Sequence, residues 1–455
     1  MSSNPDRDPP VQCGARATAW GAAARPWVGD GAAVLLLAAG AALATLWASR
    51  GLDELVIRGE NGDVWFEADC PRVFANLTDP ISIHSRSGVH PLFALVGYPA
   101  VALVRRAAGL EPLVAVRVLR ALTAGACAAA FYTLLRHIGC RRFDSVLFTV
   151  LAAVSAASMF WFVVPETYPP GLLSILLALL LVSRRDAGRT AGPTWDVLVN
   201  LATLAFTITN WIAGLLVTLV CWPVRKALGL IALSACLGGL LLIVQQQFFP
   251  SALLLPIFSE EWEYTFHWDA AGPLCAALSF FMHSIVMPTI QTTQRYGAAA
   301  APVMTIQQSG LGSSGAWGVA ATAAWLGLVA LGVYGLYTRC QQRAFRIVLG
   351  LTVAGQFLLH LVYGLETFTY ACHFGPLLVI VSALATITPA RRVALLLVLA
   401  LIPCVAVNNA QQFARARACV QHRTPARAQH ALIIRHSELL TLNSALSLLP
   451  FGSLP

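Results

Sequence analysis

Residues 31–48 of this 455-residue chain read GAAVLLLAAGAALATLWA and carry no charged side chain. An α-helix needs ~17–25 predominantly apolar residues to cross the hydrocarbon core of a bilayer, so this run is long enough to span a membrane. A polar lead of 30 residues precedes the run, and no small-x-small cleavage site follows it. We therefore expect a retained membrane anchor rather than a cleaved signal peptide.

Nine further apolar runs extend this pattern, at residues 113–135, 145–164, 170–182, 197–223, 228–248, 316–337, 347–363, 374–387 and 393–407. Run 197–223 has to contain two short helices that meet near Thr209-Asn210-Trp211 if the loops are to alternate sides. Short helices occur at membrane depth only where protein or a wet cavity covers their free backbone groups. Residues 91–104 are also apolar but short for a span, so we expect a re-entrant or interfacial segment there.

The composition supports a membrane protein and excludes several other classes. Apolar residues make up 57% of the chain and charged residues 11%, and the mean hydropathy is +0.69. This excess of apolar residues is too large for the core of a soluble enzyme, a nucleic-acid-binding protein or a disordered chain. The net charge of +9 then reflects basic loops rather than a nucleic-acid partner. The 11 cysteines include no CxxC pair, so neither a zinc site nor a disulfide framework is indicated.

Clusters of basic residues indicate the orientation of the spans. They lie at Arg136/Arg141/Arg142, Arg184/Arg185/Arg189, Arg225/Lys226, Arg339/Arg343/Arg346 and Arg391/Arg392. The short connections 165–169 and 364–373 carry no Lys or Arg. Because cytoplasmic loops carry the excess of basic residues, all five clusters are predicted to face the cytoplasm.

This orientation predicts an all-α, polytopic bundle of about eleven spans. Residues 1–30 form a cytoplasmic tail, residues 31–407 the membrane domain and residues 408–455 a C-terminal tail that lies outside. Two long outer loops, 49–112 and 249–315, contain short apolar stretches such as Trp262-Glu263-Tyr264 and 274–286, which predict juxtamembrane helices lying against the bilayer. The Ala- and Arg-rich, Lys-poor composition is typical of a GC-rich bacterial genome, so we expect a multi-pass protein of the bacterial inner membrane.

Two acidic residues mark a candidate site on the outer face. Asp69 follows the first span by about twenty residues, and Glu166 lies in the Pro165-Glu166-Thr167-Tyr168-Pro169 turn between two apolar runs. An ionisable group at the end of a span is costly unless water, a partner or a ligand meets it. Both carboxylates are therefore candidates to line one outward-facing cavity, although a solvated loop position also explains each of them.

Basic and polar residues are candidates for the same cavity. Arg117 and Arg120 share one face of the second span and could bind a phosphate through paired hydrogen bonds, or snorkel to the lipid headgroups. His90 opens the short apolar segment and is either a ligand-binding or a structural histidine. Residues 363–374 concentrate Glu366, His373 and two tyrosines in one outer turn, which favours a site over simple packing.

Three of these segments resemble, in order, the motifs of GT-C glycosyltransferases, which are multi-span enzymes that use polyprenyl-phosphate-linked sugars. Residues 69–75, DCPRVFA, are similar to the family's Asp-Glu-Pro-Arg-Tyr-Ala signature. Residues 90–93, HPLF, resemble its His-Pro-Pro-Leu-Tyr element, and residues 115–122, AVRVLRAL, its Ala-Ala-Arg-Leu-Pro-Ser-Ala-Leu. The similarity covers roughly residues 31–185. The chain departs from the pattern at Cys70, at Phe74 and in one missing proline after His90.

The resemblance implies a mechanism with Asp69 and Glu166 as the catalytic residues. Asp69 would take the proton of the acceptor hydroxyl, and Glu166 would orient the acceptor or share a divalent cation, Mg or Mn. Arg117 or Arg120 would meet the departing phosphate of the lipid-linked sugar donor. Substrate binding is further assigned to Arg72, His90, Tyr168, Asn210, Glu366 and His373. No nucleotide is required, in keeping with the absence of a glycine-rich phosphate loop from the sequence.

Two other functions compete with this interpretation. A lipid or solute transporter or flippase would also use intramembrane polar residues and broken helices, but it predicts charges deep in several spans and an internal repeat, which the sequence lacks. A catalytically inactive membrane scaffold would explain the departure at Cys70. All three share membrane lipids as partners and exclude nucleic acid.

Overall fold

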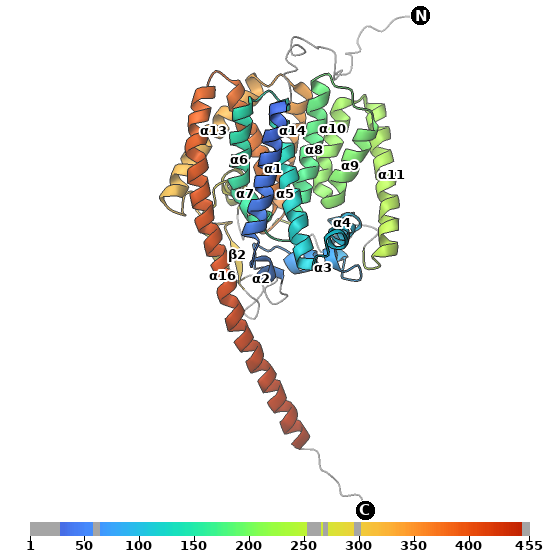
Figure 1. Cartoon of the computed structure of the whole chain (residues 1–455), viewed down its shortest axis with the longest axis vertical. Helices are drawn as coiled ribbons and strands as arrows, with labels where there is room; N and C mark the ends of the chain where they lie inside the picture. Colours follow the sequence, from blue (N-terminus) through green and yellow to red (C-terminus); the bar gives the residue numbers. More distant parts are fainter. Residues whose placement is uncertain (1–27, 58–63, 253–264, 267–271, 295–301, 448–455) are drawn as a thin grey trace, which may run out of the picture.

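The computed structural model describes residues 28–57, 64–252, 265–266, 272–294 and 302–447, with side chains given as far as residue 421. Across these ranges the chain is predominantly helical with almost no strand, which confirms the predicted all-α bundle (Figure 1). The strands in the described part are β1 (Gln291–Thr293) and β2 (Val303–Thr305), which form one short antiparallel pair.

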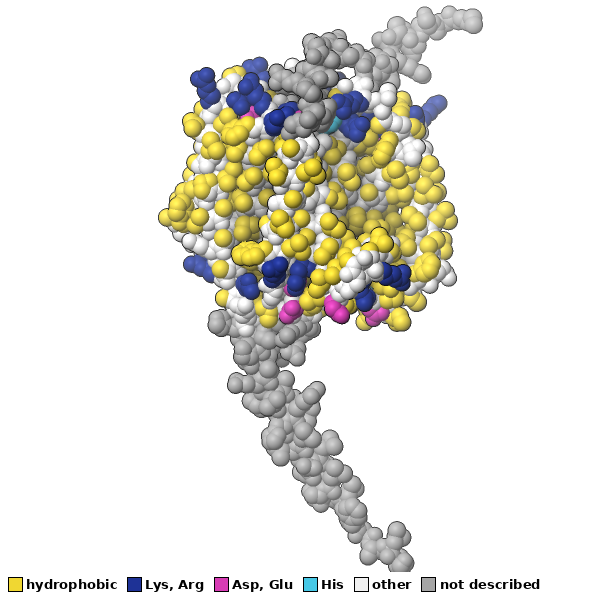
Figure 2. Space-filling view, in the orientation of Figure 1, with side chains coloured by type: hydrophobic (Ala, Val, Ile, Leu, Met, Phe, Trp, Pro, Cys, Tyr) yellow, Lys and Arg dark blue, Asp and Glu magenta, His cyan; other side chains and the backbone are white. Residues whose placement is uncertain are grey.

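Eight described helices are long and apolar enough to cross a membrane. They are α1 (Val28–Ala48), α5 (Pro112–His137), α8 (Tyr168–Asp186), α11 (Val224–Phe248), α13 (Ala316–Thr338), α14 (Arg343–Val362), α15 (Ala371–Ala383, flanked by 3₁₀ turns) and α16 (Arg391–Ser447). The remaining predicted spans correspond to shorter helices: α6 (Arg142–Val154) with α7 (Ala156–Trp161), α9 (Thr194–Phe206) and α10 (Trp211–Cys221). Figure 2 shows the resulting apolar belt, with basic side chains at both of its edges.

Run 197–223 is broken as the sequence predicts. Helix α9 ends at Phe206, a 3₁₀ turn covers Ile208–Asn210, and α10 starts at Trp211. The buried Asn200 joins the two helices, because its Oδ1 accepts a 3.0 Å hydrogen bond from the Trp211 indole and its Nδ2 donates to Thr218 at 2.8 Å. Gly214 permits this close packing, since a Cβ there would lie 3.0 Å from the Asn200 backbone.

The five basic clusters lie at one end of the bundle, at the helix ends drawn uppermost in Figure 1. Their loops are joined by polar contacts between distant segments. Arg391 pairs with the buried Asp144 at 2.6 Å, and Arg185 pairs with Asp196 at 2.5 Å. The Asp186 carboxylate also accepts the Phe345 amide at 2.8 Å, at the start of α14. Charged groups that the apolar belt could not solvate are thus neutralised at its edge.

Short helices of the first outer loop cover the opposite end of the bundle: α2 (Asp53–Ile57), α3 (Cys70–Thr78), a 3₁₀ turn (Ser85–Gly88) and α4 (Phe93–Ala108) (Figure 1). Helix α4 is amphipathic: it buries Phe93 and Val101, while Leu103 is 69% exposed. It therefore has the interfacial character expected for residues 91–104.

The second outer loop does more than lie against the bilayer. Helix α12 (Pro273–Leu278) carries the exposed Leu274, but the chain then enters the bundle, and residues 283–288 are buried. There it meets the break between α6 and α7 at Ser155, where the amides of Ala156 and Ala157 donate to the carbonyls of Ile285 and Ser284. The expectation of surface helices therefore fails for this part of residues 274–286. Residues 262–264 lie outside the described residues.

Helix α16 continues past residue 407, where we expected the last span to end. Its apolar span covers Arg391–Gln421, and the helix extends beyond the end of the bundle that lies opposite the basic clusters (Figure 1).

The orientation can be tested by labelling single added cysteines with a membrane-impermeant maleimide in spheroplasts. Ile81 is 84% exposed at the outer end, and Phe143 is 55% exposed beside the first basic cluster. We expect Ile81→Cys to react in intact spheroplasts and Phe143→Cys only after lysis, with the unaltered chain giving the background. The reverse pattern would place the basic clusters outside.

Candidate functional site

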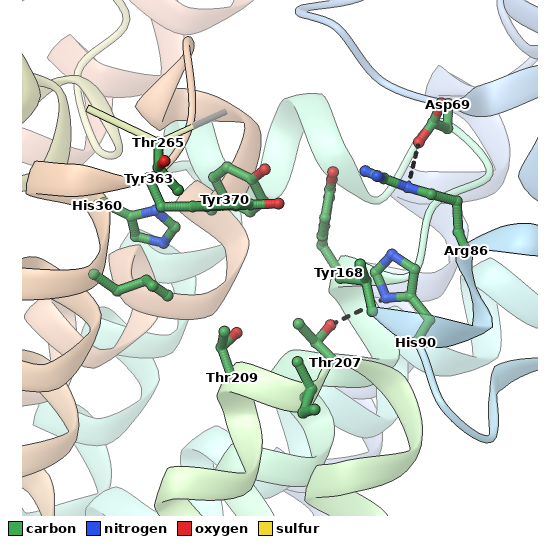
Figure 3. A pocket seen from close by; sticks show the side chains of 13 residues that line it. Asp69, Arg86, His90, Tyr168, Thr207, Thr209, Thr265, His360, Tyr363 and Tyr370 are labelled. Carbon is green, nitrogen blue, oxygen red and sulfur yellow. Dashed lines mark hydrogen bonds and ion pairs between the residues drawn. The ribbon is translucent and has the colours of Figure 1, made fainter. Parts of the chain in front are cut away.

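A cavity of about 270 Å³ opens between the outer-loop segments and the ends of α8, α10 and α14. One wall carries Asp69, Arg86 and His90, and the opposite wall carries His360 and Tyr370 (Figure 3). Tyr168 stands between the two walls, and Thr207 and Thr209 lie at the α9–α10 break. Of the residues proposed from the sequence, Asp69, His90 and Tyr168 therefore share one cavity.

The charged wall is formed at the start of α3. Asp69 is the N-cap residue, and Pro71 in the first turn fixes the backbone for the helix. Arg72, one turn later, forms an ion pair with Asp69, and the Arg86 Nε lies 3.9 Å from the same carboxylate oxygen. The Asp69 side chain is 37% exposed and lines the cavity together with Arg86, whereas Arg72 contacts Asp69 without lining the cavity.

His90 is held in one tautomer by the broken helix. Its Nδ1 donates a 2.6 Å hydrogen bond to the carbonyl of Phe206, the last residue of α9. Burial, reinforced by the charges of Arg72 and Arg86, lowers the pKa of His90 to about 3, although the Phe206 carbonyl acts in the opposite direction. The ring is therefore neutral at physiological pH, and its Nε2 is left as a hydrogen-bond acceptor.

Backbone hydrogen bonds attach this segment to the same helix break. The Leu92 amide donates to the carbonyl of Ala205 at 3.0 Å, and the Ile208 amide donates to the carbonyl of Val89 at 2.9 Å. These bonds satisfy backbone groups that the break at Thr207 frees within the apolar belt. The break thus positions the His90 ring at the cavity wall.

The opposite wall is aromatic. His360, near the end of α14, stacks on Tyr370 with ring centroids 4.6 Å apart and an interplanar angle of 20°. Tyr370 also contacts Tyr363 and Tyr168, at 5.9 and 5.8 Å between centroids. These rings present flat apolar faces with polar edges, a surface typical of sites for small polar ligands.

Asn210 and His373 lie behind Tyr168 rather than on the cavity surface. The His373 ring meets the Tyr168 ring edge-on at 5.5 Å, and Asn210 accepts a 3.1 Å hydrogen bond from Gln356. Gly171 makes room for both, because a Cβ there would lie 2.8 Å from His373 Nε2 and 2.9 Å from Asn210 Nδ2. Both residues therefore support the Tyr168 side of the site from within the bundle.

The two remaining acidic candidates are buried next to the cavity wall. Glu166 is 6% exposed, accepts the Thr167 amide at 3.0 Å and acts electrostatically on Tyr168. Glu366 accepts hydrogen bonds from the Thr305 hydroxyl at 2.5 Å and the Ile306 amide at 3.2 Å. Glu366 thereby ties the turn that carries Tyr370 to strand β2.

Arg117 and Arg120 are engaged elsewhere. Both bind the fully buried Asp53 of α2: Arg117 through two hydrogen bonds of 2.9 and 3.0 Å, and Arg120 through one of 2.8 Å. Neither lines the cavity, and together they join α2 to α5.

Within the described part of the chain, the cation that lines the cavity is instead Arg86, which the sequence analysis did not single out. It lies in the polar loop between the Asp69 and His90 motifs, and an isolated arginine in such a loop carries no pattern of its own. His360 and the two threonines were also missed, because helix ends from distant parts of the sequence bring them together, whereas Tyr370 lies in the outer turn that the sequence already indicated.

Within the described residues, no three His, Cys, Asp or Glu side chains are grouped closely enough to hold a metal ion. The described residues therefore provide no such group of protein ligands for the suggested Mg or Mn. No known protein family, characterised protein or solved structure matches this chain.

Asp53→Ala should strongly destabilise the protein. The substitution leaves Arg120, which is 6% exposed, without its counter-charge, and breaking such a buried pair costs about 3–5 kcal/mol. Chemical unfolding in detergent micelles measures the loss, with Glu54→Ala at the exposed neighbouring position as the control. Equal unfolding free energies for the two variants would contradict a stabilising role for the buried pair.

His90 should make the unfolding free energy depend on pH. Because the folded-state pKa of about 3 lies below the ordinary 6.5, the unfolded chain binds the proton first as pH falls, and stability declines between these values. His90→Asn, which keeps a donor for the Phe206 carbonyl but does not titrate, should lose less stability than wild type between pH 7.5 and 5. Thr209→Ser, a cavity change without titration, should retain the wild-type slope, and an unchanged slope in His90→Asn would refute the prediction.

Proposed function

We propose that this protein is a membrane glycosyltransferase that transfers a sugar from a polyprenyl-phosphate donor to an acceptor at the outer face of a bacterial inner membrane. The observation that carries the proposal is the meeting of Asp69, Arg86, His90 and Tyr168 around one cavity at the end of the bundle opposite the basic clusters. Asp69 and His90 lie in the segments that resemble the GT-C motifs, and Arg86 lies four residues before His90.

In the proposed reaction, the acceptor hydroxyl attacks the anomeric carbon of the donor sugar. A bond forms between this carbon and the acceptor oxygen, while the bond to the phosphate oxygen breaks and its electron pair leaves with the polyprenyl phosphate. Asp69, whose side chain reaches the cavity, accepts the proton of the hydroxyl. General-base assistance of this kind contributes about 10²–10⁴-fold to the rate.

The leaving phosphate needs positive charge, and Arg86 is the arginine that lines the cavity among the residues the structure describes. A guanidinium group can donate two parallel hydrogen bonds to a phosphate, so Arg86 is the preferred phosphate contact in this proposal. It takes the role that the resemblance gave to Arg117 or Arg120, because those two are bound to Asp53. Arg72 would then keep the Asp69 carboxylate oriented.

The cavity interior suits an uncharged polyhydroxyl group. His90 offers Nε2 as an acceptor, Thr207 and Thr209 contribute hydroxyls, and the Tyr370 ring provides an aromatic face. A volume of about 270 Å³ lies near the lower end of ligand pockets, so one monosaccharide is favoured over a longer glycan. In this proposal Glu166 orients the acceptor through Tyr168, and Asn210, Glu366 and His373 act by supporting the walls.

Asp69→Asn should lower sugar transfer by about 10²-fold or more, because the amide keeps the size of the carboxylate but cannot accept the proton. The assay follows consumption of a panel of polyprenyl-phosphate sugars by the purified full chain in lipid vesicles with membrane-extracted acceptors. Asp79→Asn, at the exposed far end of α3, is the matched control and should retain full activity.

Two outcomes would overturn this proposal. Full activity of Asp69→Asn would remove Asp69 as the base. If the wild-type chain consumed no donor but moved a lipid or solute across the vesicle membrane, the transporter interpretation would replace the enzyme.

A further inference from the structure

A second hollow, of about 400 Å³, lies at the C-terminal end of α4. It is lined by Tyr98, Ala102, Arg105, Arg106, Gly109 and Leu110. At 1.5 Å per residue, Arg105 is about 18 Å along the helix from Phe93, which follows the His90 segment. This groove is therefore distinct from the cavity described above.

The groove concentrates positive charge without a counter-charge. At the outer end of the bundle, Arg72 and Arg86 face Asp69, and Arg117 and Arg120 bind Asp53. Arg105 and Arg106, in contrast, form no ion pair within the described residues, and no carboxylate lines the groove. Two adjacent guanidinium groups repel one another, so an anion bound between them would be stabilised.

The local backbone keeps the groove open. Helix α4 ends at Gly109, whose φ of +61° is favourable for glycine, and the Leu110 amide returns to the Arg105 carbonyl at 3.1 Å. A Cβ at Gly109 would meet no atom within 4 Å, so nothing in the described chain fills this side of the groove.

The surroundings of the groove indicate a lipid rather than a soluble anion. On the same helix Leu103, three residues before Arg106, is 69% exposed, and Val96, two turns before Leu103 on the same side, is 44% exposed, so an apolar strip runs beside the groove. Tyr98 lines the groove and packs edge-on against Phe249 at 5.7 Å, where tyrosine can bridge apolar and wet regions. A phospholipid matches both parts, because its phosphate meets the arginines while its acyl chains cover the exposed leucine and valine.

We propose that Arg105 and Arg106 form a binding site for the phosphate of an anionic phospholipid of the outer leaflet. Guanidinium groups suit phosphate because of their planar, bidentate geometry, and an anionic headgroup neutralises the pair more fully than a zwitterionic one. The site anchors α4 in the interface and is independent of the chemistry proposed for the cavity.

The test follows thermal unfolding of the purified full chain in a neutral detergent, titrated with phosphatidylglycerol, phosphatidylcholine or inorganic phosphate. A ligand that binds the folded state raises the melting temperature, so each titration yields an apparent affinity. We expect stabilisation by phosphatidylglycerol at much lower concentration than by phosphatidylcholine, and none by inorganic phosphate at the same concentrations.

Arg105→Gln/Arg106→Gln should weaken the apparent affinity for phosphatidylglycerol by about 30-fold, since each arginine near an anionic lipid surface contributes about five-fold. Arg105→Lys/Arg106→Lys, which keeps the charge, should lose less. Arg50→Gln, an exposed arginine at the same end of the bundle but outside the groove, should bind as wild type. Equal affinities for the two lipids, undiminished binding by the glutamine variant, or an equal effect of inorganic phosphate would each overturn the proposal.

Discussion

The constraint on which this structure depends is that no backbone amide or carbonyl can remain without a partner inside a bilayer. Continuous helices meet it internally, but this chain breaks its helices at Ser155 and Thr207, both within the apolar belt. At the first break Ser284 and Ile285 of the second outer loop supply carbonyls, and Asn409 donates to the carbonyl of Val154 at 2.9 Å. At the second, residues 89–92 provide the missing partners. Segments of both outer loops therefore lie inside the bundle, where they form hydrogen bonds with the backbone groups that the helix breaks leave without helical partners.

The hydrogen bonding at the second helix break also explains where the candidate site lies. The second break frees the Phe206 carbonyl, which accepts a hydrogen bond from the His90 ring. The turn at the break contributes Thr207 and Thr209 to the same cavity. A continuous helix would have used that carbonyl internally and closed the space. The cavity thus lies at the short α9–α10 hairpin, and the break accounts for the positions of His90, Thr207 and Thr209 at its wall.

Much of the fold could be predicted from sequence because its determinants are local. Apolar runs of span length identify most of the long helices, and the arginine clusters mark their common end. The site was only partly predictable. Asp69 and His90 could be recognised from the prolines that follow them in the sequence. Arg86 and Tyr370 are brought to one cavity only by the packing of segments about 280 residues apart. The same limit explains Arg117 and Arg120, whose i, i+3 spacing is equally compatible with a ligand and with Asp53, the buried partner that the structure reveals.

The aspartates that form ion pairs with arginine differ in how far their side chains are exposed to solvent. Asp53, Asp144 and Asp196 are fully or almost fully buried and paired with arginine, so they secure the ends of the bundle but offer no reactive group. Asp69 is also paired, but its side chain is partly exposed and Arg86, one of its two partners, lines the cavity, so a ligand can compete for Arg86. A carboxylate in this position can exchange partners at little cost, because water replaces the lost ion pair. That difference in exposure, more than the presence of an ion pair, is why we propose Asp69 rather than the buried aspartates as the catalytic base.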